Sequence, residues 1–119
     1  LKNMLICYLH LLISTKYEKI RDAFRQNPYI IGGENRLDTK IMQNSNNLIA
    51  KVGAGGLCIV INLEHADGIV VKILDCDMQA REIATLSMIK KLNWANIPFE
   101  TDIKTIHGDV VGLMKFVGV

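Results

Sequence analysis

A lysine beside a glycine-rich turn is the arrangement in this sequence that could most readily do chemistry. Lys51 is followed by Val52, and the turn Gly53-Ala54-Gly55-Gly56 comes next. A lysine at a sheet edge can extend its amine into a pocket, and a glycine beside it lets a ligand approach the backbone because no Cβ intervenes. Lys51 is therefore a candidate catalytic lysine. The alternative is a surface lysine next to a hairpin glycine.

The segment Lys51-Val52-Gly53 is similar to the Lys-Thr-Gly motif of penicillin-binding proteins and serine β-lactamases, although Val replaces Thr. In that motif the lysine supports a serine nucleophile. The glycine-rich turn does not match a phosphate-binding loop, which needs Gly-Lys-Ser/Thr before a helix, because a strand is expected here. The same objection applies to a dinucleotide-binding fingerprint.

A second group of candidates follows the pair Gly32-Gly33. It comprises Arg36, Asp38 and Thr39 at the expected start of a helix. Asp38 or Thr39 could cap that helix through its side-chain oxygen. Alternatively, Arg36 or Thr39 could line a pocket that the glycine pair holds open.

The cysteines and histidines give no metal site. Cys7, Cys58 and Cys76 form no C-x-x-C pair, and the three histidines are widely scattered. We interpret the cysteines as small buried thiols in a reducing compartment, with Cys58 packed rather than nucleophilic. We therefore predict no metal ligands and no cofactor in this chain.

Composition narrows the class of protein. The chain has 119 residues, of which 50% are hydrophobic and 22% charged, with a net charge of +2. These values favour one folded domain over a disordered chain, and the small charge gives no reason to expect nucleic acid. The apolar run 5–13 is shorter than the roughly 20 residues that cross a bilayer, and no signal peptide is evident. We expect a cytoplasmic protein without a membrane partner.

Hydrophobic periodicity predicts mainly helices before residue 44. The expected elements are a helix over 2–13, a second helix with Ser14-Thr15 as its N-cap and Glu18 in a capping box, an end of that helix at Pro28, a loop over 30–35, and a short helix over 37–43.

From residue 48 the pattern favours strands. Three antiparallel strands are expected over 48–52, 57–63 and 69–74, then a helix over 78–92 and a terminal hairpin over 103–113. Both parities of the second and third strands are apolar, which indicates a sheet covered on both faces. The predicted class is α+β, an antiparallel meander with flanking helices.

The order of these segments resembles the asparaginase II family, the Rhizobium-type thermolabile L-asparaginases. That family shows G-G-x-x-R-x-D-T, then A-K-x-G-A-x-G, a strand, and G-x-x-x-K-I before a helix. Residues 32–39, 50–56 and 68–73 match these patterns in order. The opening Leu1-Lys2-Asn3-Met4 also resembles the segment that follows the family's D-G-C-G-x-P motif, so the resemblance covers nearly the whole chain.

The resemblance implies a fold like that of serine β-lactamases and penicillin-binding proteins, of which residues 1–119 would be a C-terminal, partial domain. It implies hydrolysis of L-asparagine to L-aspartate and ammonia by serine–lysine pairs. Lys51 would be the lysine of the second pair and the electrostatic partner of the serine hydroxyl, while a lysine poised near neutral by burial would accept or relay the proton. Gly53, Gly55, Arg36 and Thr39 would bind substrate. No specific role follows for Arg36 or Thr39.

The resemblance also places two features upstream of Leu1. These are the Ser-x-x-Lys nucleophile and the D-G-C-G segment, which is tied to a metal site, with zinc as the metal implied, in Rhizobium members. The first residue is not Met, which fits processing or a piece of a longer protein. We therefore expect no activity from this chain alone. A homodimer is compatible with the resemblance.

Two alternatives remain open at this point. The first is another amidase or peptidase on a β-lactamase-like scaffold. The second is a non-enzymatic truncated product or small binding module that keeps the sheet.

Overall fold

The computed structural model of the protein describes residues 1–118, which combine helices with two antiparallel sheets. In chain order the elements are α1 (Lys2–Ile13), the 3-10 helix η1 (Thr15–Tyr17), α2 (Glu18–Gln26), α3 (Pro28–Gly32), α4 (Leu37–Gln43), β1 (Leu48–Gly53), β2 (Leu57–Asn62), β3 (Asp67–Lys72), α5 (Met78–Lys91), β4 (Asp102–Lys104) and β5 (Val110–Leu113).

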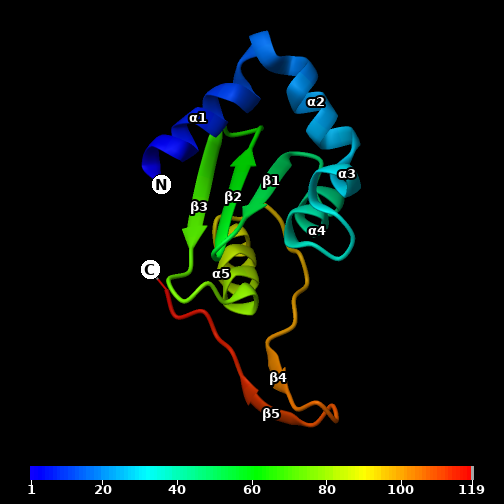
Figure 1. Ribbon diagram of the computed structural model, residues 1–119. Coiled ribbons are helices and arrows are strands. Elements are labelled where there is room, and N and C mark those ends of the chain that lie inside the picture. Colours follow the sequence, from blue (N-terminus) through cyan, green and yellow to red (C-terminus); the bar gives the residue numbers. More distant parts are fainter. Residues whose placement is uncertain (119) are drawn as a thin grey trace.

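The larger sheet is a meander of β1, β2 and β3, with β2 in the centre (Figure 1). Lys51 of β1 pairs with Ile59 of β2, which pairs in turn with Val70 of β3. Gly55 and Gly56 close the first turn with φ values of +69° and +72°. Glycine adopts these values without the strain that a Cβ brings. The predicted three-strand meander is confirmed.

The core lies on both faces of β2. From Cys58 to Asn62 every residue of this strand is buried, whatever its parity. On one face, a Cβ added to Gly68 would lie 2.8 Å from Ile61 and 2.9 Å from Leu5, so α1 packs there. On the other face, Cys58 lies close to Thr85 and Arg81 of α5. The expected two-sided covering is thus confirmed for β2, whereas β3 is an edge strand and only partly buried.

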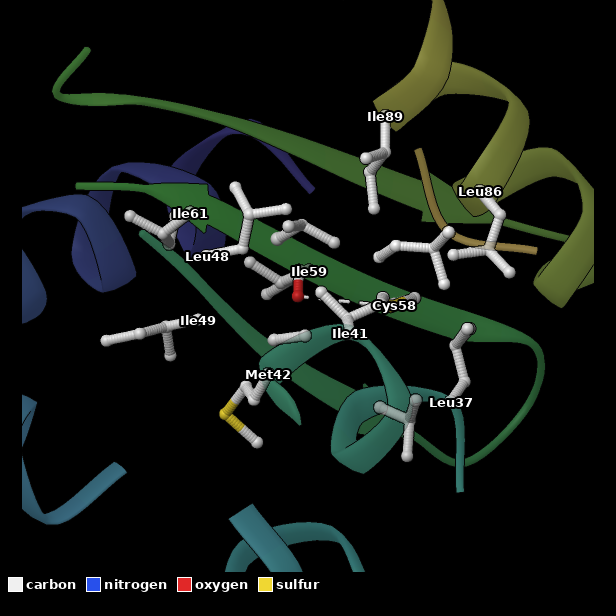
Figure 2. Packing of buried hydrophobic residues seen from close by; sticks show 14 of the residues in the cluster. Leu37, Ile41, Met42, Leu48, Ile49, Cys58, Ile59, Ile61, Leu86 and Ile89 are labelled. Atoms are coloured by element: carbon white, nitrogen blue, oxygen red, sulfur yellow. Dashed lines mark hydrogen bonds between the residues drawn. The ribbon is translucent and has the colours of Figure 1, made fainter. Parts of the chain in front are cut away.

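Helix α4 completes the core beside β1. Ile41 and Met42 of α4 are 0% and 6% exposed and belong to the same apolar cluster as Leu86 and Ile89 of α5. Figure 2 shows the α4 and α5 side chains reaching the β1–β2 region from different sides. The cluster therefore fixes α4 against β1, the strand that carries Lys51, and α5 against β2 and β3.

The region between α1 and α4 differs from the sequence-based expectation. Ser14 accepts a hydrogen bond from the Lys16 N–H and begins a 3-10 turn, so the predicted capping box with Glu18 is wrong. The loop predicted over 30–35 is partly helical, because α3 begins at Pro28. Proline lacks an N–H and has a helical φ, so it fits the first position of a helix as well as it ends one.

The last two predicted elements are confirmed. Asp77 caps α5 by accepting a hydrogen bond from the Ala80 N–H. Strands β4 and β5 pair with an irregularity at Ile103/Lys104 and form a hairpin that projects from the rest of the chain (Figure 1). The fold is α+β, as expected. Across residues 1–118, none of the helices is both long and apolar enough to cross a membrane.

Candidate functional site

Lys51 lies near the end of β1 and is paired with Asp38 of α4. Its Nζ is 3.3 Å from Asp38 Oδ2, and its side chain is 36% exposed whereas that of Asp38 is 0% exposed. Lys51 therefore keeps contact both with solvent and with a buried carboxylate. The pair directs a positive charge to the edge of the sheet.

The buried carboxylate of Asp38 also holds the backbone around it. Its Oδ2 accepts a hydrogen bond from the Val52 N–H at 3.1 Å, and its Oδ1 accepts one from the Thr39 N–H at 3.2 Å. Val52 lies on the edge strand, so this N–H would otherwise lack a partner. Asp38 thus satisfies an N–H in the first turn of α4 and, in addition, ties α4 to β1.

Thr39 and Gly32 pack against each other beneath this pair. The Thr39 hydroxyl donates a hydrogen bond to the Gly33 carbonyl oxygen at 2.7 Å and lies 3.2 Å from the Pro28 carbonyl oxygen. A Cβ on Gly32 would lie 2.3 Å from Thr39 Oγ1 and 2.4 Å from Asp38 Oδ1. Glycine at position 32 therefore permits the close approach of α3 to α4. Thr39 is 4% exposed, and its hydroxyl is engaged by the backbone of α3 and of Gly33.

The glycines after Lys51 shape the turn. The Gly55 carbonyl accepts a hydrogen bond from Lys72 Nζ, and a Cβ on Gly55 would lie 3.2 Å from that nitrogen. The Gly53 carbonyl accepts a hydrogen bond from Arg81 Nη1 at 3.5 Å. The turn is thus held by two cations, one from β3 and one from α5.

Arg36 lies on the surface between α4 and α5, where it borders two neighbouring hollows. One, of about 310 Å³, also includes Arg81 and Gln79 in its lining, and the other, of about 370 Å³, includes Lys40. Lys40 forms an ion pair of 2.9 Å with Glu82, which links α4 to α5. The structure therefore places Arg36 at a pocket, and it places Thr39 inside the fold.

Arg81 is the residue of this region that the sequence pattern did not single out. It is 6% exposed although it carries a charge. It lies on the buried side of α5 together with Thr85 and Ile89. The sequence could have indicated this burial, because Arg81, Thr85 and Ile89 are spaced by four residues and therefore share one helix face.

The thiol of Cys58 lies among these charged groups but is not activated by them. Burial is the main influence and raises the pKa of Cys58 to about 12, while Thr85, Arg81 and Lys51 lower it and Asp38 raises it further. A thiolate is the reactive form of cysteine. Cys58 is therefore a packed thiol, as the sequence suggested, whereas Cys7 and Cys76 are exposed, so the expectation of buried thiols is wrong for these two.

The low reactivity of Cys58 relative to Cys7 and Cys76 can be measured by alkylation with iodoacetamide at pH 8. At that pH only about 10⁻⁴ of a thiol with this pKa is ionised. We expect Cys7 and Cys76, which are exposed, to be labelled while Cys58 stays unmodified, as read by mass spectrometry. In urea all three should react. Labelling of folded Cys58 at the rate of Cys7 would contradict this account.

A serine–lysine spacing also occurs within α5. Ser87 and Lys90 match the letters of Ser-x-x-Lys, but Lys90 is exposed in the last turn of the helix and Ser87 is half-buried. Within residues 1–118 no hydrogen bond joins their side chains. The spacing alone therefore carries no site.

Comparison with known proteins adds one finding. The family model described as L-asparaginase II matches residues 4–115. Among curated proteins, the search found no match.

Proposed function

Because the chain belongs to the L-asparaginase II family, we propose that it supplies Lys51 and its surroundings to an enzyme that hydrolyses L-asparagine to L-aspartate and ammonia. The observation that carries this proposal is the Lys51–Asp38 pair, which unites two segments of the family pattern. Residues 32–39 and 50–56 are separate in sequence, and the 3.3 Å contact joins them. An amidohydrolase site needs such a fixed charge near the reacting group.

The proposed reaction proceeds by acyl transfer. A serine hydroxyl attacks the side-chain amide carbon, the carbon–nitrogen bond breaks, and the nitrogen leaves as ammonia with a proton. Water then attacks the resulting ester, which frees L-aspartate and regenerates the hydroxyl. We propose that the serine belongs to the protein outside residues 1–119, so these residues form the C-terminal part of a β-lactamase-like catalytic domain.

In this mechanism Lys51 is the charged partner of the serine hydroxyl. Its ammonium donates hydrogen bonds and stabilises negative charge that develops on the oxygen. Asp38 holds the ammonium in one place, and the Val52 N–H holds Asp38 to the strand. The side chain is 36% exposed, which leaves room for a reacting group to approach.

Release of ammonia from L-asparagine tests the proposal. We expect turnover by the complete gene product, none by the isolated 119-residue chain, and none with a chromogenic cephalosporin. Turnover by the isolated chain would contradict a serine outside it. A complete gene product that hydrolyses the cephalosporin or a peptide amide, and not L-asparagine, would indicate another amidase, and one without any hydrolytic activity would overturn the enzymatic function.

A further inference from the structure

Among residues 1–118, Arg81 is a buried cation without an acidic partner. Only 6% of the residue is exposed, and within residues 1–118 the one hydrogen bond of its guanidinium is the 3.5 Å contact from Nη1 to the Gly53 carbonyl. Its Nε is fully enclosed and has no hydrogen-bond partner in the part of the chain that the structure describes. A guanidinium has five N–H donors, so most of its hydrogen-bonding capacity is unused. Burial of an unpaired charge is costly, which makes a missing anionic partner the feature to explain.

The carboxylates of Glu82 on α5, Asp38 on α4 and Asp77 at the N-cap of α5 are already engaged, the last by the Ala80 N–H. Glu82, the next residue on α5, pairs with Lys40 at 2.9 Å. Asp38 accepts from Lys51, from the Val52 N–H and from the Thr39 N–H. Within residues 1–118 no carboxylate oxygen lies within 4.0 Å of the Arg81 nitrogens. The partner must therefore come from a bound molecule or from another segment.

The hollow of about 310 Å³ offers a place for such a partner. It lies between the start of α4 and the start of α5, and its lining includes Arg81, Arg36, Asn35 and Gln79. The charge of Glu82 on its rim is balanced by Lys40. Two arginines thus give the hollow a net positive charge, and two amide side chains add hydrogen-bond donors.

We infer that this hollow binds a carboxylate through Arg81 and Arg36, and that the carboxylate is the α-carboxylate of the amino-acid substrate. The second part rests on the proposed function. A guanidinium matches a carboxylate with two parallel hydrogen bonds, so it selects this group over a neutral amide. Arg81 also binds the carbonyl of Gly53, two residues beyond Lys51, so a carboxylate held there is fixed to the strand end that carries the lysine.

The test compares two ligands that differ only in that group. L-Aspartate carries the α-carboxylate, and L-aspartate α-amide replaces it by a neutral amide while keeping the side-chain carboxylate. Binding of each to the complete gene product is measured by calorimetry for the natural protein, for Arg81→Met, and for Lys90→Met. Lys90 is a matched control, because it is an exposed cation on the same helix.

The natural protein should bind L-aspartate more tightly than the α-amide. Arg81→Met should weaken L-aspartate binding on the order of 10- to 100-fold and leave α-amide binding unchanged, since a charge-assisted contact is lost only with the first ligand. Lys90→Met should alter neither. Equal weakening of both ligands would assign Arg81 a structural role and overturn the inference.

A second variant covers the case in which Arg81→Met fails to fold. Arg36 is exposed, and Arg36→Met should weaken L-aspartate binding by ~5-fold or more without affecting the α-amide. Unchanged affinity would overturn the inference. If L-asparagine is not hydrolysed but the preference for the α-carboxylate depends on Arg81, the proposed function fails and the carboxylate site stands.

Discussion

Replacement of Lys51 by methionine is expected to lower kcat for L-asparagine hydrolysis by about 10²- to 10⁴-fold in the complete gene product. The variant keeps the aliphatic length of the side chain and removes the charge that we propose to act on the serine hydroxyl. Because that charge serves the transition state more than the bound substrate, KM should change much less than kcat. Steady-state release of ammonia measures both constants.

The control for this variant is Lys104→Met. Lys104 lies on β4 and also forms an ion pair, with Glu100, but on the projecting hairpin. It should retain the kcat of the natural protein. A Lys51→Met protein that is folded by circular dichroism and keeps its kcat would remove Lys51 from the catalytic machinery. An equally large loss of kcat in Lys104→Met would show that the effect is not specific to Lys51 and would do the same.

Replacement of Asp38 by alanine is expected to lower the free energy of unfolding by about 3 kcal/mol. Two buried backbone N–H groups, those of Val52 and Thr39, lose their acceptor, and each unsatisfied group costs about 1–3 kcal/mol. The lost ion pair adds little, because Lys51 is 36% exposed and regains hydration. Urea denaturation of the variant and the natural protein measures the difference.

Two further variants show whether the effect belongs to these hydrogen bonds. Asp38→Asn keeps one acceptor oxygen, so it should lose roughly half as much stability as the alanine variant. Asp22→Ala removes a carboxylate from the surface pair with Arg21 and should cost less than about 1 kcal/mol. Equal losses for Asp38→Ala and Asp22→Ala would contradict the role of Asp38 as a link between α4 and β1.

The strands and the long helix could be predicted because their signals are local. The positive φ of Gly55 and Gly56 suits the turn after β1, and the acidic cap Asp77 marks the start of α5. Helix α3 was missed since Pro28 is compatible with both the end of one helix and the start of the next. Its five residues depend on packing against α4, which a local pattern does not contain.

The sequence identified most residues of the candidate site but not the contacts between them. The pattern drew attention to Lys51, Arg36, Asp38 and Thr39, and the structure brings Lys51 and Asp38 into contact. The sequence pattern did not indicate that the Asp38 carboxylate of α4 accepts a hydrogen bond from the Val52 N–H of β1. This contact depends on how α4 lies beside β1. The burial of Arg81 depends on the same tertiary arrangement.

The contact between Asp38 and Val52 also affects how the protein associates with copies of itself. An edge strand with free N–H groups is a template for strand addition and aggregation. Helix α4 lies alongside the outer edge of β1, and Asp38 accepts a hydrogen bond from the Val52 N–H there. The carboxylate that contacts Lys51 therefore also protects the sheet, and loss of Asp38 would free the Val52 N–H beside Lys51 for strand addition.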